Sequence, residues 1–199
     1  DFVRKTPTPG ELNPLTISTK TRAGRDSDQA AVAAFISNCG AISPRLELME
    51  ELQKYIRIDS YGRCGHNRDV PDHWTEEKDV SRGFLMQKNK ILRNRYKFLL
   101  AFENQEIDDY VTEKFYHPLG IGVLPIVLGA PNINQFTPAA NGQPAFINIK
   151  DFASMAELAE RIEYLDRNDT AYLEYFKWRS QPPSAYPPLF HSLVSYSWL

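Results

Sequence analysis

RYKFLLAFENQEIDDYVTEKFYHPLGIGVLPIVLGAPN, residues 95–132, is the stretch that decides the fold. Its first apolar run, 98–102, ends in a polar pair, and a helix is expected to open near residues 109–110. A second apolar run, 123–128, closes on a Gly-Ala-Pro turn. This order of strand, helix and strand is typical of a parallel α/β sheet, in which ligands bind outside the carboxyl ends of the strands.

The same alternation continues on both sides of this stretch. Short apolar runs predict further strands at 31–36, 56–59 and 143–149. Apolar residues at helical spacing predict helices from Ser43 as N-cap and Pro44 at the first helical position, and over 83–95, 151–166 and 169–179. The sequence therefore predicts a parallel sheet with helices on both faces.

Three regions are expected along the chain. Residues 1–29 are rich in proline, threonine and charge and are interpreted as a linker or strap. Residues 30–180 carry the α/β pattern and form the predicted domain. Residues 181–199 form a tail whose prolines favour an extended chain.

Composition excludes several classes of protein. The net charge is −2, whereas nucleic-acid binders usually carry a basic excess, so no nucleic-acid partner is expected. The basic stretch 88–97 is interpreted as a solvated helix face. No apolar run is long enough to span a membrane and no signal peptide is visible, so any membrane anchor is expected upstream of residue 1.

Several motifs occur in one order that resembles a known family. They are FISNCGA (35–41), DSYGRC (59–64), YKFLLAFEN (96–104), DYVTEKF (109–115), GVLPIVLGAPN (122–132), FINIKDF (146–152) and YLDRNDTAYLEYFKW (164–178). Together they resemble the C-terminal donor-binding region of the α-1,3-fucosyltransferases, glycosyltransferase family 10, and SNCGA with DSYGRC is most similar to the core α-1,3-fucosyltransferases. The resemblance covers residues 31–179.

The resemblance implies the Rossmann-like C-terminal half of a GT-B glycosyltransferase. Such an enzyme transfers fucose from GDP-fucose, with inversion, to a GlcNAc hydroxyl of a glycan or glycoprotein. It implies a type II membrane protein of the Golgi lumen. The catalytic base, a carboxylate, is expected in an N-terminal domain absent from this chain, so the chain alone is expected to be inactive.

The resemblance also assigns roles to residues of this chain. Arg45 and Lys114 would hold the GDP diphosphate, and two cations stabilise a departing diphosphate without a metal. Glu113, Tyr110 and Asn104 would contact the ribose or fucose, and Glu113 would favour the charged transition state. Tyr61 is placed by position alone: it closes the second predicted strand, where the guanine is expected to lie.

Each of these residues also has a purely structural interpretation. Arg45 fits a solvated helix arginine, and Lys114 fits a lysine that pairs along its own helix. Glu113 at a helix start would complement the helix dipole, and Asn104 fits a turn. The second functional hypothesis is accordingly a non-catalytic nucleotide-sugar-binding or interaction module.

Cys39 and Cys64 each follow a predicted strand, at the same edge of the sheet. A disulfide between them suits a secretory protein, and free thiols suit a cytosolic one. A zinc site with His66 and His73 is a third alternative, although its spacing matches no finger pattern. Asn168 opens an Asn-Asp-Thr acceptor for N-glycosylation.

No bound cofactor is expected. No D-x-D motif is recognised in the chain, so the donor is expected to bind without a divalent metal.

Overall fold

The protein is built around a five-stranded parallel sheet with the strand order β2-β1-β3-β4-β7. The computed structural model describes residues 20–70, 80–140, 142–181 and 185–190. The strands are β1 (Val32–Ala34), β2 (Ile58–Ser60), β3 (Phe98–Phe102), β4 (Leu124–Leu128) and β7 (Ile147–Asn148). The predicted parallel sheet is confirmed.

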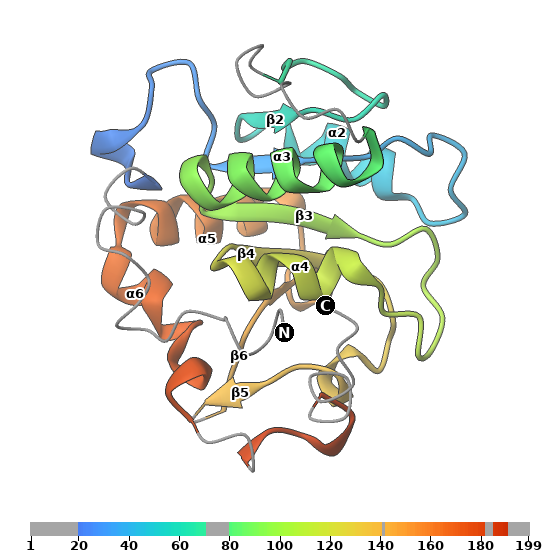
Figure 1. Ribbon diagram of the computed structural model, residues 1–199, viewed down its shortest axis with the longest axis vertical. Coiled ribbons are helices and arrows are strands. Elements are labelled where there is room, and N and C mark those ends of the chain that lie inside the picture. Colours follow the sequence, from blue (N-terminus) through green and yellow to red (C-terminus); the bar gives the residue numbers. More distant parts are fainter. Residues whose placement is uncertain (1–19, 71–79, 141, 182–184, 191–199) are drawn as a thin grey trace.

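Helices cover both faces of this sheet (Figure 1). The helices α3 (Val80–Arg95) and α4 (Glu113–Ile121) lie side by side on one face. The opposite face carries α2 (Arg45–Leu52), α5 (Met155–Arg167) and α6 (Asp169–Glu174). The order of elements follows the expected alternation of strand and helix.

The two-residue period of the central strands explains why both faces are buried. Phe98 and Leu100 point into the core with α2 and α5, whereas Leu99 packs with α3 and Ala101 with α4. Every residue of β3 and β4 is buried. Fully burying one large apolar side chain contributes about 1.5–3 kcal/mol, so these two strands anchor the domain.

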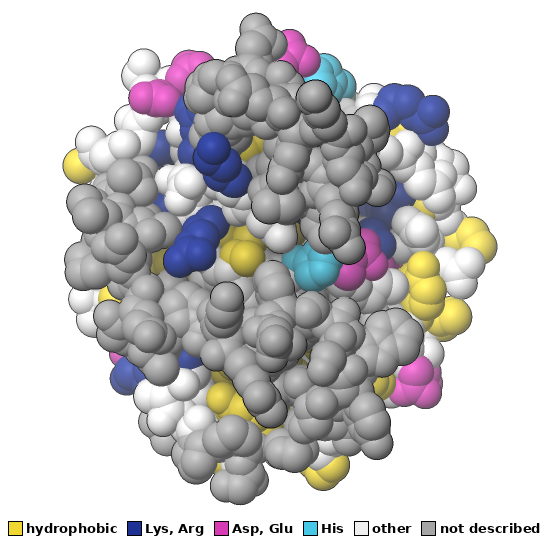
Figure 2. All heavy atoms as spheres, in the orientation of Figure 1, with side chains coloured by type: hydrophobic (Ala, Val, Ile, Leu, Met, Phe, Trp, Pro, Cys, Tyr) yellow, Lys and Arg dark blue, Asp and Glu magenta, His cyan; other side chains and the backbone are white. Residues whose placement is uncertain are grey.

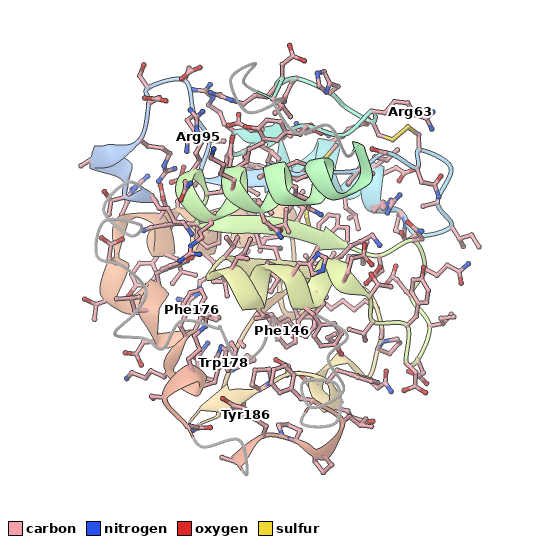
Figure 3. The ribbon with its side chains drawn as sticks, viewed as in Figure 1. Arg63, Arg95, Phe146, Phe176, Trp178 and Tyr186 are labelled. Carbon is pink, nitrogen blue, oxygen red and sulfur yellow. A yellow bond between two sulfur atoms is a disulfide. The ribbon has the colours of Figure 1, made fainter. Side chains whose placement is uncertain are left out.

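Close backbone approach fixes the turn after β2. A Cβ atom added to Gly62 would lie 2.2 Å from the carbonyl oxygen of Ile36, so only glycine fits there. This contact holds the segment after β2 against the segment after β1. It brings Cys64 to Cys39, and the two form a disulfide with a Cα–Cα distance of 5.6 Å, drawn beside Arg63 in Figure 3.

Several predicted boundaries are wrong. The expected strand 143–149 divides into β7 and β6 (Gln143–Pro144), which pairs antiparallel with β5 (Ala139–Ala140). The chain then turns through η5 (Ile149–Asp151), and α5 begins at Met155 because Ser154 caps it. The last predicted helix ends early and continues as η6 (Lys177–Ser180). Short 3-10 turns also occur at η2 (Arg22–Gly24) and η4 (Ile133–Gln135).

Aromatic side chains form a second core beyond β4. Trp178, Tyr186 and Phe190 make edge-on ring contacts, and Phe146 packs on Phe115 of α4 (Figure 3). Tyr186 and Phe190 thus pack on the domain from within the predicted tail.

Two buried lysines tie distant segments to the sheet. The Nζ of Lys97 donates to the carbonyl of Asp166 at 2.8 Å and to the Oδ1 of Asp169 at 2.5 Å. The Nζ of Lys20 donates to the carbonyl of Gly122 at 3.1 Å, although Lys20 falls in the predicted linker. Among the described residues no helix has the length and apolar character that crossing a bilayer requires.

Candidate functional site

Glu103 is the centre of the carboxyl edge of the sheet. It directly follows β3 and its side chain is only 3 % exposed. Its Oε1 accepts hydrogen bonds from the backbone nitrogen of Thr112 at 2.9 Å and from the Thr112 hydroxyl at 2.7 Å. The Nζ of Lys114 lies 3.2 Å from its Oε2. One buried carboxylate therefore joins the end of β3 to the start of α4.

Arg45 approaches the same carboxylate from α2. Its Nη1 donates to the carbonyl of Phe102 at 3.3 Å and its Nη2 to the carbonyl of Asn38 at 2.5 Å. Burial lowers the pKa of Arg45, and the charge of Glu103 opposes this effect. The Nε of Arg45 is buried and has no hydrogen-bond partner among the described residues. Arg45 is only 2 % exposed, so the interpretation as a solvated helix arginine is wrong.

Lys114 and Glu113 occupy the first turn of α4. The helix is capped by Thr112, whose hydroxyl accepts from the Lys114 nitrogen. The Nζ of Lys114 also lies 3.4 Å from the Oε1 of Glu113. The pKa of Glu113 is lowered: burial acts to raise it, but Lys114 and the helix start outweigh that effect. Glu113 is therefore an anion beside a cation, half of its side chain exposed.

The predicted start of this helix is wrong by three residues. Asp109 adopts a left-handed backbone with φ of 64°, which ends any helix there. Its nitrogen and carboxylate bond the side chain of Asn132 at 3.0 and 2.8 Å, so the loop after β3 is tied to the loop after β4. Tyr110 follows in this loop, and its electrostatic effect raises the pKa of Arg45.

The predicted cap of α2 is also wrong. Pro44 stands at the N-cap, and the Ser43 hydroxyl instead donates to the carbonyl of Glu103 at 2.6 Å. The Ser43 nitrogen donates to the carbonyl of Asn104 at 3.0 Å. These bonds fasten the start of α2 to the end of β3. Asn104 is half-buried at this junction.

The predicted site residues fall into two groups. Arg45, Tyr110, Glu113 and Lys114 lie close enough to interact around Glu103, with Asn104 next to it in sequence. Tyr61 instead stacks on Phe35 at 4.9 Å between ring centres and shares a 2.8 Å hydrogen bond with the Tyr96 hydroxyl. Its assignment to the guanine stays a prediction.

The central role of Glu103 was not among the sequence-based assignments. Its signal in the sequence is a carboxylate directly after an all-apolar strand, where a buried charge needs cations or N–H donors. The Thr112 cap and Lys114 supply both.

Figure 2 views the site region from the side of α3 and α4. A histidine and an acidic side chain lie together near the centre of this face, with basic side chains close by. Of the two described histidines, His117 belongs to α4. Burial lowers the pKa of His117, Lys88 lowers it further and Glu113 raises it.

The cysteines are joined to each other, so the zinc alternative loses two of its four ligands. His73 lies outside the described residues. Among the residues that the structure describes, no group of three or more metal-ligating side chains is found. The expectation that the chain lacks a D-x-D motif is wrong, because residues 26–28 form such a triplet. The triplet precedes β1 at the opposite edge of the sheet, where Asp26 pairs with Arg95 at 2.7 Å.

Asn168 caps α6. Its Oδ1 accepts from the Ala171 nitrogen at 3.0 Å and its Nδ2 donates to the Tyr164 hydroxyl at 3.2 Å. The side chain is half-buried in this junction between α5 and α6. Its glycosylation stays a prediction.

Comparison with known proteins defines the class. Residues 26–191 match the sequence model described as "Glycosyltransferase family 10 (fucosyltransferase) C-term". The chain therefore belongs to glycosyltransferase family 10, as the motifs indicated.

Individual relatives carry different names. The chain is 43% identical over 149 residues to "Glycoprotein 3-alpha-L-fucosyltransferase A" of Drosophila melanogaster, covering 74% of this chain and 27% of the relative. It is 42% identical over 159 residues to a "Putative fucosyltransferase-like protein" of Arabidopsis thaliana, covering 79% and 28%. It is 36% identical over 163 residues to "GDP-fucose protein O-fucosyltransferase 3" of Homo sapiens, covering 81% and 32%. The chain thus spans about a third or less of these relatives.

A solved structure supports the fold. The crystal structure titled "alpha1,3-Fucosyltransferase with GDP" superimposes with a TM-score of 0.62 at 22% identity, over 91% of this chain and 49% of that one. The Rossmann-like sheet is therefore that of the C-terminal half of a GT-B enzyme.

Proposed function

We propose that this chain is the donor-binding half of an inverting α-1,3-fucosyltransferase that uses GDP-fucose. The observation that carries the proposal is the convergence of Arg45 and Lys114 on Glu103 at the carboxyl edge of the sheet. A diphosphate placed there would lie close to two cations and to the start of α4.

In the proposed reaction, an acceptor hydroxyl attacks the anomeric carbon of fucose on the face opposite the departing GDP. A base from a part of the enzyme outside this chain removes the proton. Arg45 and Lys114 stabilise the negative charge that grows on the diphosphate, and guanidinium is suited to this because it is planar and permanently charged. Glu113 stabilises the positive charge that develops on the sugar ring.

The acceptor has two candidates. The similarity to the Drosophila glycoprotein 3-alpha-L-fucosyltransferase supports a GlcNAc hydroxyl of a glycoprotein glycan. The relatives named protein O-fucosyltransferase 3 support a hydroxyl of the polypeptide itself. Parallel assays with a GlcNAc-terminated glycan and with a serine- or threonine-containing peptide distinguish them by which product gains fucose.

We also propose that the enzyme works in the Golgi lumen, as a type II membrane protein. The support within this chain is the disulfide between Cys39 and Cys64, since disulfides persist in oxidising compartments. A fluorescent fusion of the protein that remains in the cytosol would refute this localisation.

Calorimetric titration with GDP tests donor binding. We expect Lys114→Ala to weaken GDP binding at least about tenfold, which corresponds to about 1.4 kcal/mol. Lys177→Ala is the matched control, because Lys177 is exposed and pairs with Glu174 away from this edge. Equal affinities of the two variants would remove the diphosphate assignment. Binding of GDP without fucosyl transfer by the complete protein would favour the non-catalytic module.

A further inference from the structure

Lys88 is a half-buried cation on α3 that approaches the carboxyl end of β1. Its Nζ lies 5.3 Å from the ring centre of Phe35, which directly follows β1. The Phe35 ring is itself stacked on Tyr61. Lys88 is therefore held over an aromatic pair, where a cation gains attraction from the ring face.

The charged groups that act on the pKa of Lys88 belong to the first turn of α4. Burial lowers the pKa of Lys88, Glu113 raises it and Lys114 lowers it. Lys88 in turn lowers the pKa of His117, which Glu113 raises. The residues 113 and 117 are one turn apart on α4, and α4 packs against α3 (Figure 1). Glu113 and Lys114, which are both assigned to the donor, therefore act on the charge of Lys88.

The charge balance of the site shows why this matters. Arg45 and Lys114 are two cations, and Glu103 and Glu113 are two carboxylates beside them. These four charges cancel, so the assigned residues alone leave a neutral site for a polyanionic diphosphate. Lys88 supplies a net positive charge at the same edge.

We infer that Lys88 is a third cation of the donor diphosphate site, a role that rests on the proposed function. In the unliganded protein its ammonium group lies over the ring of Phe35. When the diphosphate enters, Lys88 neutralises charge that Lys114 cannot, because Lys114 is already shared between Glu103 and Glu113. The basic stretch 88–97 is therefore not uniform, and one of its lysines faces the site.

Titration of the wild-type protein and three variants with GDP and with guanosine tests this role. Lys88→Gln removes the charge and keeps most of the side-chain length, and Lys90→Gln is the control because Lys90 is exposed on the same helix. We expect Lys88→Gln to weaken GDP binding about fivefold or more, as loss of a charge-assisted contact does, with guanosine affinity unchanged. Lys90→Gln should stay within about twofold of wild type, and Lys88→Arg should restore most of the GDP affinity.

Each outcome bears on one proposal or the other. Equal GDP affinities for Lys88→Gln and Lys90→Gln would overturn the role of Lys88 while leaving the proposed function standing. An equal loss of affinity for GDP and for guanosine would also overturn this role, because guanosine has no phosphate and cannot be affected when a phosphate contact is removed. If the wild-type protein bound no GDP, the proposed function and the inference would fail together.

Discussion

The Nζ of Lys114 lies 3.2 Å from the Oε2 of Glu103. The other carboxylate oxygen of Glu103 accepts hydrogen bonds from the backbone nitrogen and the hydroxyl of Thr112, the N-cap of the same helix. A single buried side chain thus fixes both the direction of α4 and the position of its cation. This arrangement holds Lys114 at the crevice before any ligand arrives, so less side-chain freedom is lost on binding.

The first prediction concerns the charge of Glu103. Glu103→Gln keeps an oxygen that can accept from Thr112 but removes the partner of Lys114. We expect the free energy of unfolding to fall by about 1–2 kcal/mol, because Glu103 is buried whereas its partner Lys114 is partly exposed. Urea denaturation measures this change. Glu160→Gln, on the exposed face of α5, is the control, and equal midpoints for the two variants would show that the ion pair is not stabilising.

The sequence anticipated the sheet because its signals are local. Apolar runs marked β3 and β4, and a parallel sheet brings the ends of those runs to one edge. It also placed Cys39 and Cys64 at that edge, although whether they bond depends on the close approach at Gly62. The prediction of the buried face of α5 is confirmed, and this face includes Met155, Leu158, Ile162 and Leu165.

The remaining differences arise from long-range contacts. Ser43 fits the pattern of a helix cap, yet its hydroxyl is drawn to the carbonyl of Glu103, sixty positions along the chain. Asp109 looks like the first residue of a helix, yet the Asn132 side chain holds it in a left-handed conformation. Lys88 shares a basic stretch with the exposed Lys90 and with the buried Lys97, and its own position depends on the packing of α3 against α4.

The second prediction concerns the disulfide. It closes a loop with a sequence separation of 25, and cross-links of this size contribute roughly 3 kcal/mol by restricting the unfolded chain. We expect reduction of the wild-type protein to lower its urea midpoint accordingly. The double variant Cys39→Ser/Cys64→Ser should match the reduced wild type and show no response to reductant, because the chain has only two cysteines. A wild-type midpoint that reductant leaves unchanged would contradict the stabilising role.

The third prediction concerns Lys20 and pH. Burial, with Arg179, Arg93 and Lys97 nearby, lowers the pKa of Lys20 to about 7. Between pH 7 and the unfolded value near 10.5, the unfolded chain holds a proton that the folded protein has released. Stability from this group therefore rises with pH across that window, by up to roughly 3–5 kcal/mol, and is constant below it.

Urea denaturation of Lys20→Met between pH 7 and pH 10 isolates this effect from other titrating groups. The variant lacks the buried ammonium, so its advantage over wild type should shrink steadily as pH rises. Lys54→Met removes an exposed lysine and should differ from wild type by the same amount at every pH. A pH-independent difference for Lys20→Met would mean that Lys20 stays charged in the folded protein.

The fourth prediction concerns the guanidinium of Arg45. It bridges the carbonyls of Asn38 and Phe102, which follow and end two neighbouring strands, and a single ammonium group cannot reproduce this fork. We expect Arg45→Lys to lower the free energy of unfolding by about 1–2 kcal/mol and the melting temperature by a few degrees. GDP affinity should fall at least about tenfold, because an ammonium group also replaces the planar guanidinium at the proposed diphosphate site. Arg63→Lys, at an exposed position, should change neither quantity. A fall in melting temperature without a fall in GDP affinity would make Arg45 a structural bridge and leave Lys114 and Lys88 to bind the diphosphate.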